Sequence, residues 1–558
     1  MTMKRRMTIA VLLLTALCGQ GQTTEPATEA VRNMKVGWNL GNTLDACNGK
    51  RVTDVTVSET MWGQPVTRPE LMQMMQEAGF GAIRVPVTWY PHIDDHNRVD
   101  AQWMQRVHEV VDYVLQTGMY CILNVHHDTG AGDNWLHANM SIYDEQKSHF
   151  EQLWQQIAEE FKDYGERLLF ESYNEMLDKY DSWCFATFAR PNGYNATDAT
   201  DAYNAINSYA QSFVNTVRAT GGNNSQRNLV VNTYGACCGE GNWNAHLQDP
   251  LKQMKLPTDT SEGHLIFQVH CYPNIENLTT TKNSVSQMFK YLNTYLAAKG
   301  APVIIGEWGS SSGDDYMNRH DNLVKFIDYF VQQAKANNFA TFYWMGISDG
   351  STRTLPAFSQ PDLARAILQA YYGNTYSPTL PTVDDYDITY TVSYNGQWQE
   401  LNLCSDEVSL DNYKAIRVEL GETPKSGTLS VKMYGEADGK EQYTAVTQQS
   451  QTVNFNRSNL GGKTRRITLQ YSKSEPYTIS VKHAYLVRSD GTLMEMRVSP
   501  FWGCTVETKA TKKSTPVRQT TMDDTPGDSC LYTLSGLRMT KAGKRGIYIS
   551  NNKKIIIK

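Results

Sequence analysis

Two glutamates, Glu175 and Glu307, stand at the ends of two apolar runs that the sequence predicts to be strands. In a barrel of parallel strands the carboxyl ends of the strands meet at one rim, and enzymes with this fold build their active sites there. We therefore expect the two carboxylates to face each other. Cleavage of a glycosidic bond needs such a pair, because one protonated carboxyl donates to the leaving oxygen while an ionised one stabilises or attacks the anomeric carbon.

Two polar neighbours strengthen this interpretation. Asn174 directly precedes Glu175, and a residue of its kind can donate to a sugar 2-hydroxyl. Arg84 lies inside an apolar run, where a buried cation requires a carboxylate partner, and Glu307 is our candidate. That pairing would keep Glu307 ionised, whereas Glu175 among aromatic walls would favour its neutral form.

The elements that position these residues follow a repeating pattern. From residue 28 to 373, short apolar runs alternate with segments of helical periodicity, which is typical of parallel strands joined by helices. We predict a (β/α)8 TIM barrel, an α/β fold, with long loops at 178–201 and 235–263 that shape a cleft. Its eight strands begin near Val36, Ala82, Tyr120, Leu168, Leu229, Leu265, Val303 and Ala340.

Seven segments, in order along these runs, resemble glycoside hydrolase family 5. They are 37–45 (GWNLGNTLD), 83–89 (IRVPVTW), 124–128 (NVHHD), 173–175 (YNE), 269–272 (VHCY), 305–308 (IGEW) and 342–344 (FYW). The resemblance implies a retaining endo-β-1,4-glucanase in which Glu175 is the acid/base and Glu307 the nucleophile, with carboxyl groups ~5–5.5 Å apart. We expect no cofactor and no metal.

The resemblance also assigns substrate-binding roles. The nucleophile is supported by Arg84 and Tyr272, and the sugar at the cleavage point is surrounded by His126, Asn174 and His270, with Trp344 as its stacking floor. Two further positions match residues that touch sugar in the endoglucanase-rich subfamily 4, namely His127 and Asn42.

Two departures from the family pattern bear on substrate rather than mechanism. Met176 follows the acid/base where proline is common, and Asp128 follows the two histidines where subfamily 4 has glutamate. The sequence therefore does not decide whether the substrate is cellulose, mixed-linkage glucan or xyloglucan, with xylan and mannan as alternatives.

The ends of the chain predict export. Residues 1–21 combine Lys4, Arg5 and Arg6 with a short apolar run, as in a signal peptide, so we expect a secreted or cell-surface protein. Lipidation at Cys18 is the less favoured alternative. No later run approaches the ~20 apolar residues of a membrane span.

A formal charge of −6 without basic blocks argues against nucleic acid as a partner. We expect a monomer whose partner is a polysaccharide.

Beyond the barrel the pattern becomes that of an all-β accessory domain, predicted at 384–508 between linkers at 374–383 and 509–529. Its aromatic residues Trp398, Tyr443 and Trp502 are either a glycan-binding face or core. Residues 530–558 resemble the C-terminal sorting domains of Bacteroidota, with a small β tail as the alternative. Nine cysteines follow the signal peptide without metal-like spacing, and we assign no disulfide, so their pairing stays open.

Two other functions compete with hydrolysis by paired glutamates. A metal-dependent barrel hydrolase would use His126, His127, Asp128 and His270 as ligands. Neighbouring residues of a strand point to opposite faces, so His126 and His127 share a metal only if the strand has already ended. The second alternative is a carbohydrate-binding surface protein without turnover, which has no need of both glutamates.

Overall fold

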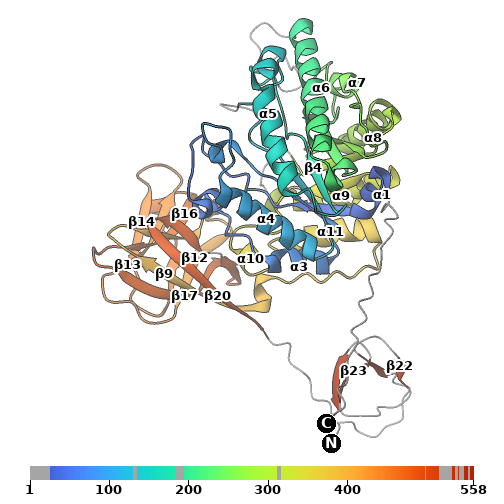
Figure 1. Cartoon of the computed structure of the whole chain (residues 1–558). Coiled ribbons are helices and arrows are strands. Elements are labelled where there is room, and N and C mark those ends of the chain that lie inside the picture. The colour runs from blue at the N-terminus through green and yellow to red at the C-terminus, as the bar shows by residue number, and fades with distance from the viewer. Residues whose placement is uncertain are drawn as a thin grey trace, which may run out of the picture. The chain divides into compact units, whose positions relative to one another are not determined.

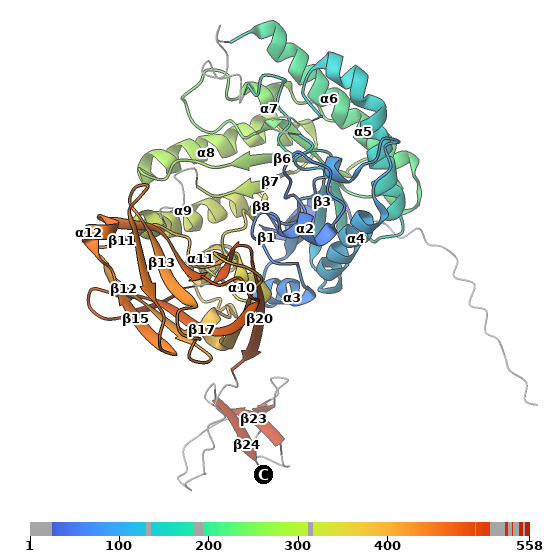
Figure 2. The same cartoon turned by 90° about the vertical axis from the view of Figure 1, so that its left-hand side faces the viewer.

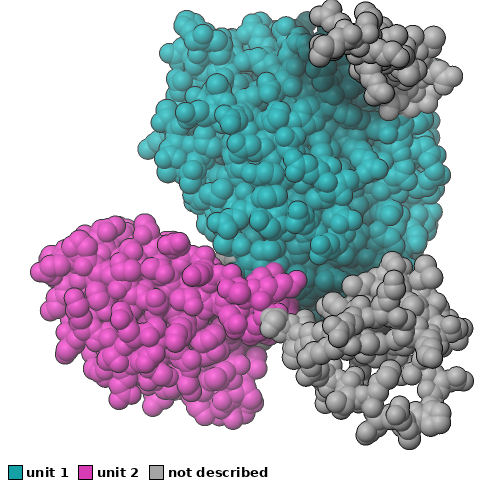
Figure 3. All heavy atoms as spheres, turned by 60° about the horizontal axis from the view of Figure 1, so that its bottom comes forward, with its two compact units in different colours: residues 1–383 teal, residues 384–558 magenta. Residues whose placement is uncertain are grey.

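The computed structural model describes residues 25–129, 135–182, 194–310, 316–496, 498–513 and the short strands 531–533, 538–539, 546–550 and 553–557. The predicted signal peptide and Cys18 lie outside these residues. The chain divides into two compact units, Met1–Val383 and Asp384–Lys558, coloured separately in Figure 3. None of the described helices is both long and apolar enough to cross a membrane.

The first unit is a closed barrel of eight parallel strands paired in chain order, which confirms the predicted TIM barrel. Every strand begins at the predicted residue. Helices surround the strands, as Figures 1 and 2 show. The strands are β1 Val36–Asn39, β2 Ala82–Val85, β3 Tyr120–Asn124, β4 Leu168–Glu171, β5 Leu229–Cys237, β6 Leu265–Cys271, β7 Val303–Trp308 and β8 Ala340–Tyr343.

The helices bury one apolar stripe against the strands. In α3, Leu71, Met74, Met75 and Ala78 follow the helical spacing i, i+3, i+4, i+7, and all four are buried. The helices of this unit are α1 Ala27–Met34, α2 Val55–Thr60, α3 Pro69–Ala78, α4 Ala101–Gln116, α5 Met140–Glu160, α6 Ala196–Ala219, α7 Asp249–Gln253, α8 Leu278–Tyr295, α9 Tyr316–Ala336, α10 Ser351–Thr354 and α11 Pro361–Tyr372.

The inside of the barrel changes character along the strands. A buried apolar layer includes Ile122, Leu169, Val230 and Ile266, and the apolar face of α1 packs with it. Because side chains alternate between the two faces of a strand, the residue two positions further on also points inward. At that level every one of six strands carries a polar residue: Asn39, Arg84, Asn124, Glu171, Asn232 and Gln268.

The loops differ from the prediction in two places. The predicted loop 178–201 gives way to α6 from Ala196, and the predicted loop 235–263 begins inside β5 and contains α7. Cys237 is disulfide-bonded, a pairing that the sequence leaves unassigned. An odd count and buried strand positions favoured free thiols, but pairing depends on which cysteines the fold brings together. The free cysteines of the described part are Cys47, Cys121, Cys238, Cys271, Cys404 and Cys504.

The second unit contains two antiparallel sheets, ordered β14-β13-β16-β10-β19 and β15-β12-β17-β9-β20, with β11 and β18 attached to β16 and β17. A separate small sheet has the order β22-β21-β23-β24. Along β13, buried residues alternate with partly exposed ones, as expected when one face packs on a core. The strands are β9 Tyr386–Tyr394, β10 Glu400–Cys404, β11 Val408–Ser409, β12 Tyr413–Leu420, β13 Leu429–Gly435, β14 Glu441–Ala445, β15 Ser450–Asn454, β16 Lys463–Tyr471, β17 Tyr477–Arg488, β18 Leu493–Met496, β19 Ser499–Trp502, β20 Cys504–Lys512, β21 Leu531–Thr533, β22 Arg538–Met539, β23 Gly546–Ser550 and β24 Lys553–Ile557.

Candidate active site

Arg84 is the centre of the polar layer at the carboxyl end of the barrel. It is fully buried and points inward from β2. Its guanidinium forms a bidentate ion pair with Glu171, with both N···O distances at 2.7 Å, and a second ion pair of 2.6 Å with Glu307. The predicted pairing of Arg84 with Glu307 is therefore present, but Arg84 is shared with Glu171. Burial lowers the pKa of Arg84, and the two carboxylates outweigh burial and raise it.

Glu171 differs from the other two glutamates because its oxygens are fully supplied with donors. Besides Arg84, the amide nitrogens of Asn124 and Asn232 donate to its Oε1 at 3.1 and 3.3 Å. Burial raises the pKa of Glu171, but Arg84 has the stronger combined effect and the net shift is downward. Glu171 is thus an ionised carboxylate that holds Arg84 in place.

Glu307 reaches the site through an irregularity in β7. Val269 pairs with Ile305, yet His270 pairs with Glu307, so Gly306 is an extra residue between them. Without this bulge, Glu307 would share the outward face of Ile305; the inserted residue turns it inward. A Cβ on Gly306 would lie 2.3 Å from the Gln268 side chain, so only glycine leaves room there.

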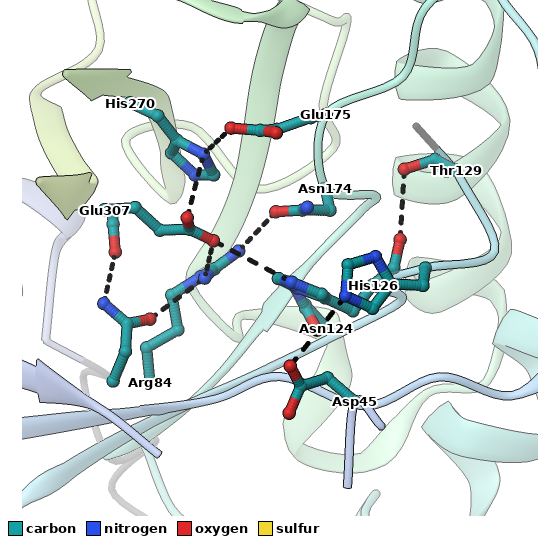
Figure 4. A network of polar contacts seen from close by, with 12 residues as sticks. Asp45, Arg84, Asn124, His126, Thr129, Asn174, Glu175, His270 and Glu307 are labelled. Carbon is teal, nitrogen blue, oxygen red and sulfur yellow. Dashed lines mark hydrogen bonds and ion pairs between the residues drawn. The ribbon is translucent and has the colours of Figure 1, made fainter. Parts of the chain in front are cut away.

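His270 connects Glu175 and Glu307, as Figure 4 shows. Its Nδ1 forms a 2.7 Å hydrogen bond with Glu175 and lies 3.6 Å from Glu307 Oε2. An oxygen of Glu175 and an oxygen of Glu307 lie within 4.8 Å of each other. Glu175 is in the loop beyond β4, which ends at Glu171, and not at the strand end that we predicted. The structure nevertheless brings the two predicted glutamates face to face.

The two glutamates sit in environments that raise the pKa of both. Burial raises the pKa of Glu175 to about 7, with Arg84 opposing and Glu171 adding to the shift. Burial also raises the pKa of Glu307, against the opposing effects of His270 and Arg84. The ion pair with Arg84 therefore offsets the burial of Glu307 only in part. The predicted neutral preference of Glu175 agrees with its environment.

Two further predicted residues contact this pair. The Tyr272 hydroxyl donates to Glu307 Oε2 at 2.9 Å, so Glu307 is held from two sides. Asn174 accepts from Arg84 through Oδ1 at 2.9 Å, which orients its amide nitrogen away from the arginine. Burial lowers the pKa of His270 to about 4, so its imidazole is neutral at neutral pH.

Trp344 and the two histidines of 124–128 form one side of the site. The rings of His126 and Trp344 are nearly parallel, with centroids 5.9 Å apart. A Cβ on Gly41 would lie 2.8 Å from the Trp344 ring, so this glycine lets the indole lie flat against the backbone. His127 packs edge-on against the exposed Trp62. Trp344 is half-buried and thus does not lie in the core.

Asn42 occupies the loop after β1 in a left-handed conformation with φ of 60°. Its backbone N–H donates to Asp45 Oδ2, and Asp45 lies 3.9 Å from His127 Nε2. Burial raises the pKa of Asp45 to about 6. Asn42 and His127 are therefore neighbours through Asp45, which the sequence analysis did not single out.

The structure does not gather the four residues of the metal alternative. Asp128 instead accepts hydrogen bonds from the backbone N–H groups of Trp89 and Tyr90 and from the Trp135 indole. Because β3 ends at Asn124, His126 and His127 can lie on one side, and they do so with Asp45. Among the described residues, two groups have oxygen and nitrogen atoms close enough to hold an ion: Asp45 with His126 and His127, and Glu175 with His270 and Glu307.

Five residues of the polar layer escaped the sequence analysis: Asn39, Asn124, Glu171, Asn232 and Gln268. Each lies two positions beyond an inward-facing residue of its strand: Asn39, Asn124 and Glu171 end β1, β3 and β4, whereas Asn232 and Gln268 lie within β5 and β6. Asn39, for example, accepts from Arg84 and donates to the backbone oxygen of Gly306. The period of two, applied to each predicted strand, would have identified them.

Residues 46–350 match the family model described as cellulase (glycosyl hydrolase family 5). The chain is 32% identical over 357 residues to "Endoglucanase B" of Neocallimastix patriciarum, covering 61% of this chain and 69% of the relative. A solved "GH5-4 broad specificity endoglucanase from an uncultured bacterium" is 56% identical, with a TM-score of 0.61 over 63% of this chain and 97% of its own. A glycoside hydrolase family 5 enzyme from Prevotella bryantii, solved with a xyloglucan tetradecasaccharide, is 40% identical, with a TM-score of 0.56 over 62% and 99%.

Proposed function

Because the chain belongs to glycosyl hydrolase family 5 and is a cellulase-like glycoside hydrolase, we propose that it cleaves internal β-1,4 bonds of a plant β-glucan with retention of configuration. One observation carries this proposal: oxygens of Glu175 and Glu307 lie within 4.8 Å of each other. This close approach of one oxygen from each group favours the ~5–5.5 Å carboxyl separation of retaining enzymes over the ~6.5–9.5 Å that inverting enzymes leave for a water.

Glu307 is the proposed nucleophile. Its oxygens are oriented by Arg84 and Tyr272, and its carboxylate attacks the anomeric carbon as the glycosidic bond breaks. The product of this step is a glycosyl ester on Glu307. When water later releases the sugar, Glu307 leaves as a carboxylate, and the ion pair with Arg84 stabilises that charge.

Glu175 is the proposed acid and base. With a pKa of about 7, a large fraction of Glu175 carries a proton at neutral pH and can give it to the leaving oxygen. The resulting carboxylate then takes a proton from the water that attacks the glycosyl ester. Asn174 supports this step, because its amide nitrogen is free of Arg84 and can donate to the 2-hydroxyl. Trp344 offers an indole face for the sugar ring.

The proposed substrate is a β-1,4-glucan, with xyloglucan among the accepted polymers. The similarity to a GH5-4 broad specificity endoglucanase and to an enzyme solved with xyloglucan supports subfamily 4. Asp128, one of the two departures from the family pattern, accepts hydrogen bonds from the loop backbone at Trp89 and from the Trp135 indole. Mannan and xylan are the alternatives.

Incubation of the purified chain with a panel of plant polysaccharides tests the proposal. We expect β-1,4-glucans to yield a broad range of oligosaccharides early in the reaction, as internal cleavage requires. Proton NMR of the first products should show the β-anomer before mutarotation. An initial α-anomer would contradict retention, and absence of hydrolysis of every β-glycan would leave only a binding protein.

Export is part of the proposal. The signal-like residues 1–21 and the sorting-like residues 530–558 support secretion to the medium or cell surface of a Bacteroidota bacterium. Mass spectrometry of the protein from culture medium should find an N-terminus after residue 21. A lipid on Cys18 would instead support membrane anchoring.

A further inference from the structure

A hollow lies on the second unit, over the sheet β14-β13-β16-β10-β19. Its volume is about 620 Å³, and its eight lining residues are Trp398, Glu400, Lys432, Tyr434, Tyr443, Gln470, Phe501 and Trp502. In β13, Leu429, Val431 and Met433 are buried in the core, so Lys432 and Tyr434 belong to the opposite, outer face. The hollow is therefore on the outer face of this sheet.

Four large aromatic side chains of the hollow are exposed to solvent. The exposed fractions are 55% for Trp398, 53% for Tyr443, 41% for Phe501 and 66% for Trp502. Tyr443 is on β14 and Trp502 on β19, the two outer strands of the sheet order. The question that the sequence left open is thus answered for these rings: they do not form core. Five strands at a spacing of about 4.8 Å separate the two edges by ~19 Å.

The floor between the rings is polar, and its groups are joined by hydrogen bonds to Glu400. Glu400 is 5% exposed, and its carboxylate accepts hydrogen bonds from Tyr434, Thr468 and Gln470 at 2.7–3.0 Å. Lys432 completes the group with an ion pair of 3.3 Å. Its ammonium also lies over the Tyr434 and Tyr443 rings, with centroid distances of 4.2 and 5.4 Å. The floor therefore positions both the polar groups and one aromatic wall.

The backbone at Trp398 is a second, independent sign of a binding role. Its φ is 67°, in the left-handed region that bulky residues rarely adopt. Its N–H donates to the Tyr471 backbone oxygen at 2.8 Å, which fixes this conformation. Glycine or asparagine would adopt it at less cost, so folding alone does not explain an exposed tryptophan here. Strained residues of this kind cluster at ligand-binding sites.

We propose that this face binds the chain of a neutral β-glucan, separately from the barrel. Flat, exposed rings stack on the apolar faces of pyranose rings, and the amide, hydroxyl and ammonium groups of the floor bond to their hydroxyls. The ammonium of Lys432 is paired with Glu400, so the floor favours an uncharged ligand over an acidic one. The choice of a β-glucan rests on the proposed function, whereas the choice of a glycan rests on the hollow.

Native electrophoresis of the full chain in polysaccharide-containing gels tests the proposal. Every protein carries Glu175→Gln to prevent turnover, and the gels contain β-glucan, xylan, mannan, an α-glucan or no polymer. Trp398→Ala/Trp502→Ala is compared with Leu493→Ala, which removes another exposed apolar residue of the same unit. We expect the double substitution to weaken retardation by β-glucan about tenfold or more, as loss of central aromatic contacts does.

The same substitutions in the otherwise wild-type chain separate this face from the barrel. We expect kcat/KM for a short soluble oligosaccharide to stay within about twofold of wild type, because its cleavage needs the barrel alone. Unchanged retardation of the double variant in every gel, or equal loss in Leu493→Ala, would overturn the proposal. Failure of the wild-type chain to hydrolyse any glycan would instead contradict the proposed function and leave the gel result intact.

Discussion

The mouth of the barrel and the outer sheet face of the second unit each hold a carboxylate with little contact with solvent, but they supply it with hydrogen-bond donors differently. Glu400 receives donors from Tyr434, Thr468, Gln470 and Lys432. Glu175, in contrast, has a hydrogen bond with His270, and burial raises its pKa to about 7. A carboxylate with surplus donors is a fixed structural group, whereas one with few donors keeps an oxygen free and changes its charge near neutral pH.

The barrel repeats this contrast within one site. Glu171 takes two guanidinium nitrogens of Arg84 and two amide donors, and its pKa is lowered. Glu307 takes one guanidinium nitrogen and the Tyr272 hydroxyl, and its pKa is raised. Burial is common to both, so the allocation of donors decides which glutamate is structural and which can react.

The largest effect is expected from Glu307→Gln. The amide keeps the shape of the side chain but cannot form the glycosyl ester, so kcat should fall by about 10⁴-fold or more. Initial rates on a soluble β-glucan measure this loss. Glu400→Gln is the matched control, since it neutralises a buried glutamate with surplus donors; on a short oligosaccharide it should leave kcat unchanged. Comparable losses in both variants would break the distinction between the two regions.

Arg84→Met should have the next largest effect, on stability as well as activity. It leaves Glu171 and Glu307 buried without their cation, which costs about 3–5 kcal/mol. The barrel's thermal transition, followed by calorimetry, should move down. Arg218→Met is the control, because Arg218 forms a buried ion pair with the single carboxylate Asp259. Its cost should be smaller, with catalysis retained. An equal cost would mean that sharing between two carboxylates adds nothing.

Much of the barrel site was predictable because its signals are local. Apolar runs placed all eight strands, and the residues that follow them, including Glu175 and His126, were expected at one rim. What the sequence could not supply is the sharing of Arg84, since alternation turns Glu171 into the barrel but does not show which cation, here 87 positions away, it meets. The inward turn of Glu307 likewise depends on the bulge at Gly306, which becomes visible only when β7 is paired with its neighbours β6 and β8.

The sheet of the second unit was less predictable. Alternation identified β strands, but it could not say which face of a sheet would be covered by another element. Trp398, Tyr443 and Trp502 therefore remained either core or binding face until their exposure was known. Glu400 gave no signal at all, because its donors come from β13 and β16, distant in sequence and joined only by the strand order.

Glu400→Gln tests whether the donors around Glu400 contribute to the stability of the second unit. The amide cannot accept all the hydrogen bonds of the carboxylate and leaves Lys432 without its ion pair. We expect the unfolding free energy of the second unit to fall by about 1–3 kcal/mol. Chemical denaturation monitored by tryptophan fluorescence measures it, with Glu441→Gln on neighbouring β14 as control. If the two substitutions cost the same, the donors around Glu400 do not stabilise it.

The smallest and most diagnostic effect is on the pH profile. Since burial raises the pKa of Glu175 to about 7, its acid form predominates below that pH and is lost above it. We expect kcat/KM on a soluble oligosaccharide to fall about tenfold per unit on the alkaline side. The same raised pKa means that the folded chain binds this proton more tightly than the unfolded one. The stability contributed by Glu175 is therefore present below its unfolded pKa and lost as pH rises toward 7.

Glu171→Gln should shift the alkaline limb of the pH profile, the pH range in which kcat/KM falls, and the charges around Glu175 give the direction of that shift. It removes a negative charge that raises the pKa of Glu175, and it frees the positive charge of Arg84, which lowers that pKa. Both changes favour the ionised form of Glu175, so the limb should shift toward acid pH. Glu400→Gln changes a charge of the same sign in the other unit and should leave the limb in place. If the alkaline limb stays in place in Glu171→Gln, or moves toward alkaline pH, Glu171 does not set the charge state of the proposed acid. The contrast between carboxylates with surplus donors and those with few donors would then have no functional meaning.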